Sequence, residues 1–467
     1  MVLLGCPSTM LCMVPLPGTG RYREGKRTGP PPHPARSPRM LHHLPVTQRP
    51  DPRRTVIRPF LPSDPEAFVT PGHPRAERII ARVLAIDSDE LHRELARVQQ
   101  SLDQRHRDVP ELLARRYESV ASMVPSGCDP APDQRTLIGA YLSAEYSFEA
   151  AALFNPSAVP HPDQSNLPDG AIRILVSLRG IGEGHLSSVT FRTGVWHADD
   201  TLTMDEPSDT AVPPVFDTPT GWKDGDVVAL DCGGARDPSE VVLFPVVESQ
   251  SGGIEDMRLT PLDGPDGRRT YAGTYTALGS RGIRQELLFT DDFRAFRMRP
   301  IGGALAKAKG MALFPRQIAG RWMAVTRQDN ENLWLAHSDD LNTWAVDGKL
   351  LGPHYPWEII QMGNCGPPIE IAEGWLLLTH GVGVVRNYCL GAALLDKDDP
   401  SRVLGRTPHP LMEPGPEDRD GYVPNVVYSC GGLVRDRTLL LPYGIADNYA
   451  SFATVSIDDI LAAMKLP

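Results

Sequence analysis

Short apolar runs separated by turn residues make up most of the chain after about Pro132. Three of them are "IRILVSL" (172–178), "TYAGTYTAL" (270–278) and "GWLLLTH" (374–380). Because the side chains of a β-strand point alternately to its two faces, apolar runs of this length between turn residues predict strands packed in sheets. We therefore expect residues 132–467 to form an all-β domain.

These strands follow a weak repeat in which an apolar strand ends in an acidic pair. The pairs lie at Asp291, Asp339, Asp398 and Asp458, with Asp199 and Asp200 as an earlier relative. Their intervals are roughly 50 to 60 residues, and units of a few strands at such spacing are typical of β-propeller blades. The chain has room for about five units, and we interpret the acidic pairs as solvated turns.

The first part of the chain has a different composition. It is rich in Pro, Arg, Gly and His, as in "RTGPPPHPARSPR" (27–39). Such a segment cannot bury enough apolar surface to offset the entropy of ordering, so residues 1–54 are predicted to be a disordered leader. Prolines interrupt the opening apolar stretch, which argues against a secretory signal, and Met40 is an alternative start of translation.

Residues 55–131 are predicted to be a helical extension. From Leu91 onwards, apolar residues recur at spacings of three and four, which places them on one face of a helix. Asp87 and Glu90 form a predicted capping pair for this helix, and a second helix is expected to begin near Asp108. No candidate catalytic residue is spaced along these helices, so packing on the main domain is their expected role.

Charge and composition narrow the classes of partner. A formal net charge of -11 at pH 7 argues against a general nucleic-acid or membrane-surface binder and favours small molecules. The seven cysteines are widely spaced without a CxxC pair, which favours a cytoplasmic location. No apolar run approaches the roughly 20 residues of a membrane helix. Neither a phosphate-binding GxxxxGK loop nor a His–Cys cluster is present, so we expect no metal, nucleotide or redox cofactor.

Several stretches occur in a specific order along the all-β part. They are "ALFNPSAVPH" (152–161), "ILVSLRG" (174–180), "GIEDMRLT" (253–260), "KGMALFPRQIAGRW" (309–322), "GPPIEIAEGWLLLTHGV" (366–382), "GAALLDKDDPSRVLGR" (391–406), "GYVPNVVYSCGGLV" (421–434) and "LLPYGIAD" (440–447). This order resembles glycoside hydrolase family 130 over roughly residues 145–465. The resemblance implies a five-bladed β-propeller, here with an α-helical N-terminal extension. It also implies cleavage of β-mannosides with inversion, at a central cavity.

The stretch at residues 253–260 matches a family motif that usually reads Glu-Asp-Pro-Arg, with Met257 in place of the proline. The resemblance implies that Asp256 is the catalytic acid, which passes its proton through a sugar hydroxyl to the glycosidic oxygen. A carboxyl group can serve as this acid if its surroundings keep it protonated near neutral pH. The neighbouring Arg258 would lower its pKa unless it points elsewhere, and Glu255 or a substrate oxyanion is then the expected partner of Arg258.

The attacking group separates two kinds of enzyme. A phosphorylase needs cationic donors for inorganic phosphate, its co-substrate, and the family positions imply Arg179, Lys309, Arg327 and His380 for this role. An inverting β-1,2-mannosidase instead needs a second carboxylate as base, about 6.5 to 9.5 Å from the acid. The candidate bases are Glu149, Glu183 and Glu370. Phosphorolysis to α-mannose 1-phosphate is the favoured prediction, with hydrolysis as its alternative.

Sugar recognition requires polar groups that converge on hydroxyls. The resemblance implies Asn155, Asp447 and Asn425 as polar positions of this kind. Arg258 is a predicted substrate-binding residue as well, and His185 is a further candidate. A non-catalytic sugar-binding propeller would use the same pocket, so this third alternative also stays open. The expected partners are a β-mannoside oligosaccharide and inorganic phosphate, and the resemblance further implies that the chain can form homo-oligomers.

Overall fold

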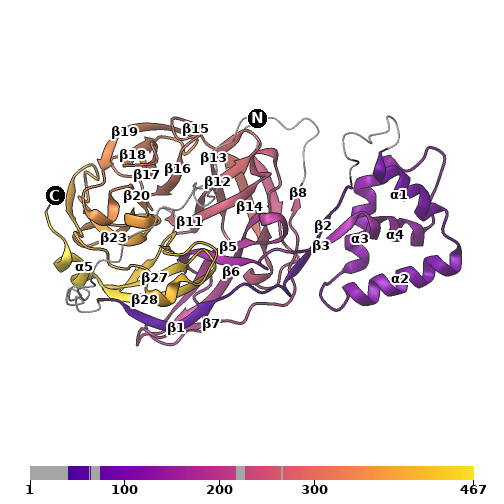
Figure 1. The fold of residues 1–467 in the computed structure, drawn as a ribbon, viewed down its shortest axis with the longest axis horizontal. Helices are drawn as coiled ribbons and strands as arrows, with labels where there is room; N and C mark the ends of the chain where they lie inside the picture. The colour runs from indigo at the N-terminus through magenta and orange to yellow at the C-terminus, as the bar shows by residue number, and fades with distance from the viewer. Residues whose placement is uncertain (1–39, 63, 65–73, 217–226, 265–266, 467) are drawn as a thin grey trace, which may run out of the picture.

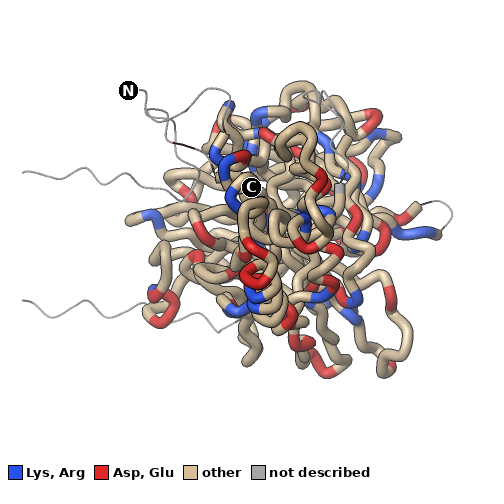
Figure 2. Tube along the Cα trace, turned by 90° about the vertical axis from the view of Figure 1, so that its right-hand side faces the viewer, with Lys and Arg blue, Asp and Glu red and all other residues tan. Residues whose placement is uncertain are grey.

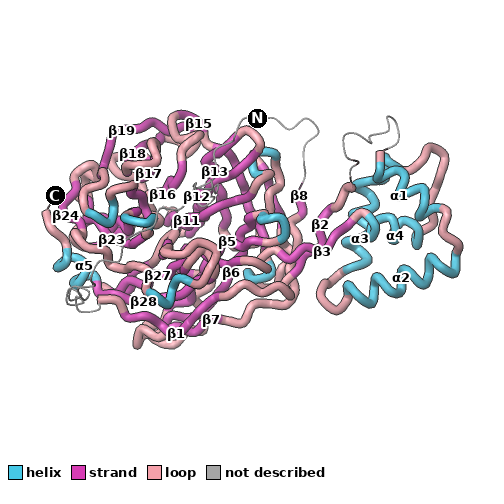
Figure 3. The backbone as a smooth tube through the Cα atoms, viewed as in Figure 1, coloured by secondary structure: helices cyan, strands magenta, loops and turns pink. Residues whose placement is uncertain are grey.

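The computed structural model describes residues 40–62, 64, 74–216, 227–264 and 267–466. A body built of strands carries, on one side, a separate lobe of helices (Figure 1). The two-stranded sheet of β2 (Thr55–Pro59) and β3 (Ser143–Ser147) joins the lobe to the body. Figure 3 shows the same division, with the four long helices gathered in the lobe.

Five mainly antiparallel sheets form the body, and each corresponds to one blade. Blade 1 contains β4 (Ala152–Pro160), β5 (Ile172–Ile181), β6 (Ser187–Trp196), β7 (Leu202–Met204) and β10 (Val242–Leu243). Blade 2 contains β8 (Val215–Phe216), β9 (Val228–Asp231), β11 (Gly253–Asp263), β12 (Arg269–Gly279), β13 (Gly282–Thr290) and β14 (Ala295–Pro300). Blade 3 contains β15 (Gly302–Gly303), which pairs in parallel with β19, then β16 (Lys309–Leu313), β17 (Trp322–Arg327), β18 (Leu333–Ser338) and β19 (Thr343–Leu351).

Blade 4 contains β20 (Gln361–Asn364), β21 (Ile369–Ile371), β22 (Gly374–Val382), β23 (Tyr388–Leu395) and β24 (Val403–Arg406). Blade 5 contains β25 (Val427–Tyr428), β26 (Leu433–Arg435), β27 (Thr438–Ile445), β28 (Tyr449–Ser456) and β1 (His42–Gln48). Inner strands of successive blades lie against one another, β4 beside β11, β11 beside β16 and β16 beside β20, and β27 lies against β4. The fold is the predicted five-bladed β-propeller.

The predicted repeat corresponds to the blades. An acidic pair follows the third strand of each blade: β6, β13, β18, β23 and β28. In four blades the pair lies in a turn, where nearby Asp carboxylates accept backbone N–H bonds, for example from Thr201 to Asp199 at 3.1 Å. At blade 5, Asp458 instead begins helix α5 (Ile457–Ala463). The interpretation of these pairs as turns is therefore confirmed in four of the five blades.

Strand β1 corrects the predicted leader. Residues 1–39 lie outside the described residues, but His42–Gln48 pairs antiparallel with β28, so the prediction of disorder up to residue 54 is wrong for this segment. Leu44 is buried in a core cluster shared by blades 1 and 5, together with Leu153 and Leu440. The chain therefore closes its ring by adding its first described strand to the sheet that contains its last.

The helical lobe contains α1 (Arg75–Leu84), α2 (Ser88–Leu102), α3 (Val109–Val120) and α4 (Pro132–Tyr141). The predicted cap of α2 is confirmed, since the Asp87 carboxylate accepts the backbone N–H of Glu90 at 3.0 Å. Two expectations need correction. The lobe extends past residue 131 to include α4, whose Leu137 and Ile138 belong to its core. It is also an insertion between β1 and the rest of the propeller rather than an extension at its end.

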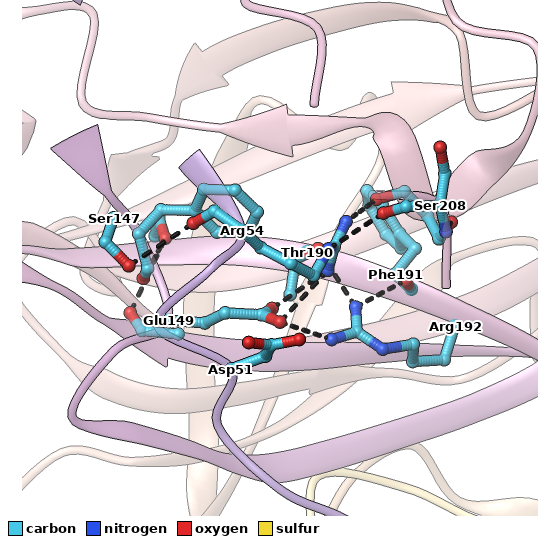
Figure 4. A network of polar contacts seen from close by, with 12 residues as sticks. Asp51, Arg54, Ser147, Glu149, Thr190, Phe191, Arg192 and Ser208 are labelled. Atoms are coloured by element: carbon cyan, nitrogen blue, oxygen red, sulfur yellow. Dashed lines mark hydrogen bonds and ion pairs between the residues drawn. The ribbon is translucent and has the colours of Figure 1, made fainter. Parts of the chain in front are cut away.

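A buried ion-pair network anchors the base of the lobe to blade 1 (Figure 4). Arg54, just before β2, contacts both carboxylate oxygens of Glu149 at 3.1 Å, and Arg192 of β6 contacts the same carboxylate at 2.7 Å. All three side chains are almost completely buried. A carboxylate between two arginines in this position is well paired, which a buried charge requires.

The surface carries charges of both signs. Figure 2 shows Lys and Arg positions interspersed with Asp and Glu positions along the Cα trace. Among the described residues, none of the helices is long and apolar enough to cross a membrane.

Candidate active site

A cavity lies where the inner strands begin. It is lined by residues near the start of β4, β11 and β16, and by residues near the end of the second strands β5, β12, β17 and β22. Eight of the site residues predicted from sequence line it: Asn155, Arg179, Asp256, Arg258, Lys309, Arg327, His380 and Asp447. The further candidates His185 and Asn425 are not among its lining residues. The structure thus brings together residues from every blade, while their individual roles stay predictions.

Backbone irregularities in three inner strands turn side chains into this cavity. The pairing register shifts at Asn155 in β4, at Asp256 in β11 and at Gly310 in β16, as in a β-bulge. These residues have left-handed φ angles of 49°, 53° and 69°. Asn, Asp and Gly are the residue types that adopt this conformation most readily, so the local sequence suits the bulges.

The contacts of Asp256 favour a carboxylate. Its Oδ1 accepts hydrogen bonds from Asn155 Nδ2 at 2.7 Å and from Arg179 Nη1 at 3.3 Å. Burial would raise the pKa of Asp256, but Arg179 and Arg258 outweigh it, and the pKa lies below its usual value. The surroundings of Asp256 therefore favour its ionised form over the protonated acid.

The two residues that flank Asp256 have other partners than the sequence suggested. Arg258 donates to the backbone oxygen of Asp256 at 3.0 Å and to the Tyr428 hydroxyl at 2.8 Å, so its charge acts on the carboxylate without a direct hydrogen bond to it. Glu255 does not pair with Arg258. Its carboxylate contacts Arg179 Nη2 at 2.8 Å and Lys309 Nζ at 3.8 Å, and it holds these two cations in place.

His380 lies in the cavity as a neutral imidazole. Burial, together with Arg327 and Arg258, lowers its pKa to about 3. Its Nδ1 faces the carbonyl oxygen of Asn364 at 3.2 Å, and because a carbonyl only accepts, this nitrogen carries the proton. The buried Nε2 is then an acceptor without a partner. His380 is therefore suited to a hydroxyl group of a sugar or of a protonated phosphate, and the expectation of a cationic donor is corrected.

Asp447 is the second unusual carboxyl group in the cavity. It follows β27 with a left-handed φ of 50° and is 4% exposed. Burial raises its pKa to about 7, and neighbouring Asp256 adds to the increase although Arg179 opposes it. Its Oδ2 has no hydrogen-bond partner, and the same is true of Asn155 Oδ1 and Arg327 Nε. Buried polar atoms without partners at a cavity wall are groups that a polar ligand would satisfy.

The three candidate bases of a hydrolase lie elsewhere. Glu149 is enclosed between Arg54 and Arg192. Glu370 pairs with Arg316 at 2.8 Å near the surface, and Glu183 is exposed. None of the three lines the cavity, so their proposed role as base is wrong.

Sequence reasoning missed several cavity residues, among them Glu255 in its bridging role, Asn364 and two tyrosines. Tyr428 binds Arg258, and the ring of Tyr388 stacks on His380 with centroids 6.0 Å apart. Tyr428 lies within one of the family-like stretches, and Asn364 lies just before another. Nothing in their spacing marks them as cavity residues. Their position depends on how blades 4 and 5 meet.

Comparisons with known proteins agree with this fold and identify the family. Residues 235–466 match the model of a family described as beta-1,4-mannooligosaccharide phosphorylase. A 1,2-beta-oligomannan phosphorylase of Thermoanaerobacter sp. (strain X514) is 35% identical over 230 residues, 47% of this chain and 73% of the relative. A beta-1,2-mannobiose phosphorylase of Listeria innocua serovar 6a is 32% identical over 252 residues, 52% of this chain and 67% of the relative.

One solved structure supports the fold at lower identity. A putative glycoside hydrolase from Bacteroides ovatus ATCC 8483 has a TM-score of 0.50 and 21% sequence identity, and the match covers 67% of this chain and 88% of that one. Fold and site together define a propeller enzyme of carbohydrate metabolism. The chain belongs to glycoside hydrolase family 130, the family of the mannoside phosphorylases.

Proposed function

We propose that this protein cleaves a β-mannoside by phosphorolysis with inversion, releasing α-mannose 1-phosphate and a shortened sugar. Membership of the family makes it an enzyme that acts on β-mannosides. The two relatives compared above by sequence are named as phosphorylases, and both names refer to β-1,2-linked mannosides. A β-1,2-linked mannobiose or oligomannan is therefore the substrate to test first.

The observation that carries the proposal is the excess of cations around Asp256. Among the described residues lining the cavity, Arg179, Arg258, Lys309 and Arg327 face Glu255, Asp256 and Asp447. Since the pKa of Asp447 is about 7, its carboxyl group is partly neutral at neutral pH and the positive excess grows. A cavity with an excess of positive charge suits a divalent anion such as phosphate. Phosphate also needs no general base to act as a nucleophile.

Binding of phosphate would also prepare the acid. Arg179 is the principal group that lowers the pKa of Asp256, and a phosphate on Arg179 and Lys309 offsets that influence. Asp256 then takes up a proton and delivers it to the glycosidic oxygen, directly or through a sugar hydroxyl. As the C1–O bond to the leaving sugar breaks, a phosphate oxygen forms a bond to C1 from the opposite face. The products are α-mannose 1-phosphate, a free sugar hydroxyl and an ionised Asp256.

Hydrolysis is less well supported because none of the three glutamates predicted as its general base lines the cavity. Glu149, Glu183 and Glu370 lie outside the cavity, and Glu255 is already bound to two cations. Asp447 is the remaining carboxyl group for such a role. A sugar-binding propeller without activity would not require the close contacts of Asp256 with Asn155 and Arg179.

The test is phosphate dependence. The full chain is incubated with β-1,2- and β-1,4-linked mannobioses with and without inorganic phosphate, and both sugar phosphate and free mannose are measured. Phosphate-dependent formation of α-mannose 1-phosphate is the expected result. Release of mannose at a rate that ignores phosphate would establish the hydrolase instead, and binding without turnover of any mannoside would leave a sugar-binding protein. Homo-oligomer formation and a cytoplasmic location stay predictions.

A further inference from the structure

The turns that join the second and third strands of the blades follow closely after residues that line the cavity, and we define the mouth of the cavity as the side on which these turns lie. The cavity residues Arg179, Thr276 and His380 lie close to the ends of β5, β12 and β22. The next residues of each chain segment form the turns into β6, β13 and β23. Because these turns continue the strands beyond the cavity, whatever extends out of the cavity passes between them.

Two of these turns, in blades 1 and 4, have the same conformation. Each is a 3₁₀ turn, Glu183–His185 in blade 1 and Val384–Arg386 in blade 4. A glycine precedes each turn, and its backbone N–H donates to the carbonyl oxygen of the residue four positions later. Both have left-handed residues at their tips, with φ of 58° at His185 and 54° at Arg386. Non-glycine residues in this conformation are strained, and such strain often marks a functional surface.

An exposed aromatic pair stands on the blade 1 side of the mouth. The rings of His185 and Tyr422 have centroids 5.8 Å apart and are tilted by 36°. Tyr422 is 58% exposed, and the next residue, Val423, donates its backbone N–H to the oxygen of Ala446 at 3.0 Å. Ala446 directly precedes Asp447, so the aromatic pair lies beside the turn that carries this cavity carboxyl group.

We propose that His185 and Tyr422 form a platform for the leaving-group sugar of the substrate, so that these two residues help to set acceptor specificity. This inference rests on the proposed phosphorolysis. The cavity encloses Asp256 and the cationic cluster, so the mannosyl unit and phosphate occupy it, and the second sugar extends towards the mouth. Sugars present apolar C–H faces that pack on aromatic rings, and polar tips such as the Tyr422 hydroxyl and the His185 imidazole bond to their hydroxyls.

The turn in blade 4 does not offer an equivalent platform. Its tip carries Val384 and Val385, which are 81% and 85% exposed, where blade 1 has a charged residue and a glycine. Arg386 occupies the position that His185 has in blade 1, and its guanidinium lies 5.9 Å from the centre of the Tyr388 ring. The two turns thus have the same backbone conformation but different side chains, and the exposed aromatic pair lies on the side of His185.

The experiment runs the reaction in reverse, with α-mannose 1-phosphate as donor and mannose as acceptor, and follows phosphate release. Tyr422→Ala and His185→Ala are each expected to raise the KM for the acceptor about tenfold, the size of a lost aromatic contact. The KM for α-mannose 1-phosphate should stay within about twofold, since the groups that bind it lie inside the cavity. Tyr422→Phe should keep most of the acceptor affinity, and Tyr141→Ala, an exposed tyrosine on the helical lobe, is the matched control.

The outcomes separate the two proposals. Phosphate release by the parent protein, combined with an unchanged acceptor KM in Tyr422→Ala and His185→Ala, would overturn the platform and leave the proposed function intact. An equal rise in both KM values would also overturn it, because the effect would then be a general disturbance of the site. Absence of turnover by the parent protein with any mannoside, in either direction, would overturn the proposed function and the platform with it.

Discussion

At the scale of single residues, burial has made Asp447 the carboxyl group that changes charge near neutral pH. Its pKa in the folded protein is about 7, against 3.8 for an ordinary Asp. Between these values the folded protein binds a proton that the unfolded chain does not. The contribution of Asp447 to the free energy of unfolding is therefore fully present below about pH 4, and it is lost as the pH rises through about 7.

Asp447→Asn removes this titration and provides the first test. The free energy of unfolding of the wild type should decrease relative to the variant as the pH rises from 5 to 7, by at most about 1.4 kcal/mol per pH unit. Urea denaturation of both proteins at pH 5 and pH 8 measures the difference. A stability difference that is the same at the two pH values would show that Asp447 keeps an ordinary pKa.

Asp256→Asn tests the acid. The amide keeps the size of the side chain but cannot donate a proton as an acid does, so kcat should decrease by about a hundredfold or more. Phosphate binding, measured by calorimetry, should persist because Arg179 and Lys309 remain. Asp291→Asn, in a turn after the third strand of blade 2, is the matched control and should keep full activity. An Asp256→Asn variant with wild-type kcat would remove Asp256 from the mechanism.

At the scale of secondary-structure elements, the bulges of the inner strands are the feature that builds the site. Gly310→Ala tests one of them. The added methyl group would have space, with its nearest neighbour Arg258 Nη2 at 3.8 Å, but the φ of 69° would be strained. We expect a loss of about 1 to 2 kcal/mol in stability and a weaker affinity for phosphate, since the bulge sets the position of Lys309.

The control for this variant is Gly348→Ala in β19. A methyl group there meets no atom within 4 Å and the φ is not positive, so the substitution should be neutral or slightly stabilising. Thermal unfolding and phosphate titration compare the two variants. Equal effects of both substitutions would mean that the bulge conformation contributes nothing at Gly310.

The network around Glu149 makes a prediction for the base of the helical lobe. Glu149→Ala leaves Arg54 and Arg192 buried without their shared anion, which should cost about 3 to 5 kcal/mol of stability. Glu370→Ala breaks an ion pair with Arg316 near the surface and should cost less than about 1 kcal/mol. Chemical denaturation of both variants checks the difference. Similar losses in the two variants would contradict the assignment of the Glu149 network as a buried anchor.

At the scale of the whole molecule, closure of the ring depends on β1. Leu44→Ala removes buried apolar contacts between blades 1 and 5 and should cost about 2 to 5 kcal/mol, through lost burial and a residual cavity. His42→Ala, an exposed position in the same strand, should change the stability by less than about 0.5 kcal/mol. Urea denaturation measures both. Equal stabilities of the two variants would show that β1 adds little to closure.

Local pattern was sufficient for the strands and for the number of blades. The runs around Ile174, Tyr275 and Leu377 are strands as predicted, because a strand buried on one or both faces needs apolar residues at short, regular spacing. The cavity residues were found through ordered family motifs rather than through periodicity. The boundaries of the lobe and the partner of Glu255 were mistaken, because neither leaves a signal in neighbouring residues.

The amino-acid order therefore predicted an all-β propeller and, through the family motifs, eight of the residues that line its cavity. The charge states of Asp256, His380 and Asp447, the exclusion of Glu149 as a base and the pairing of His42 with Thr454 became visible only in the folded chain. The physical reason is that strand patterns are local, whereas desolvation, ion pairing and closure of the ring depend on residues hundreds of positions apart.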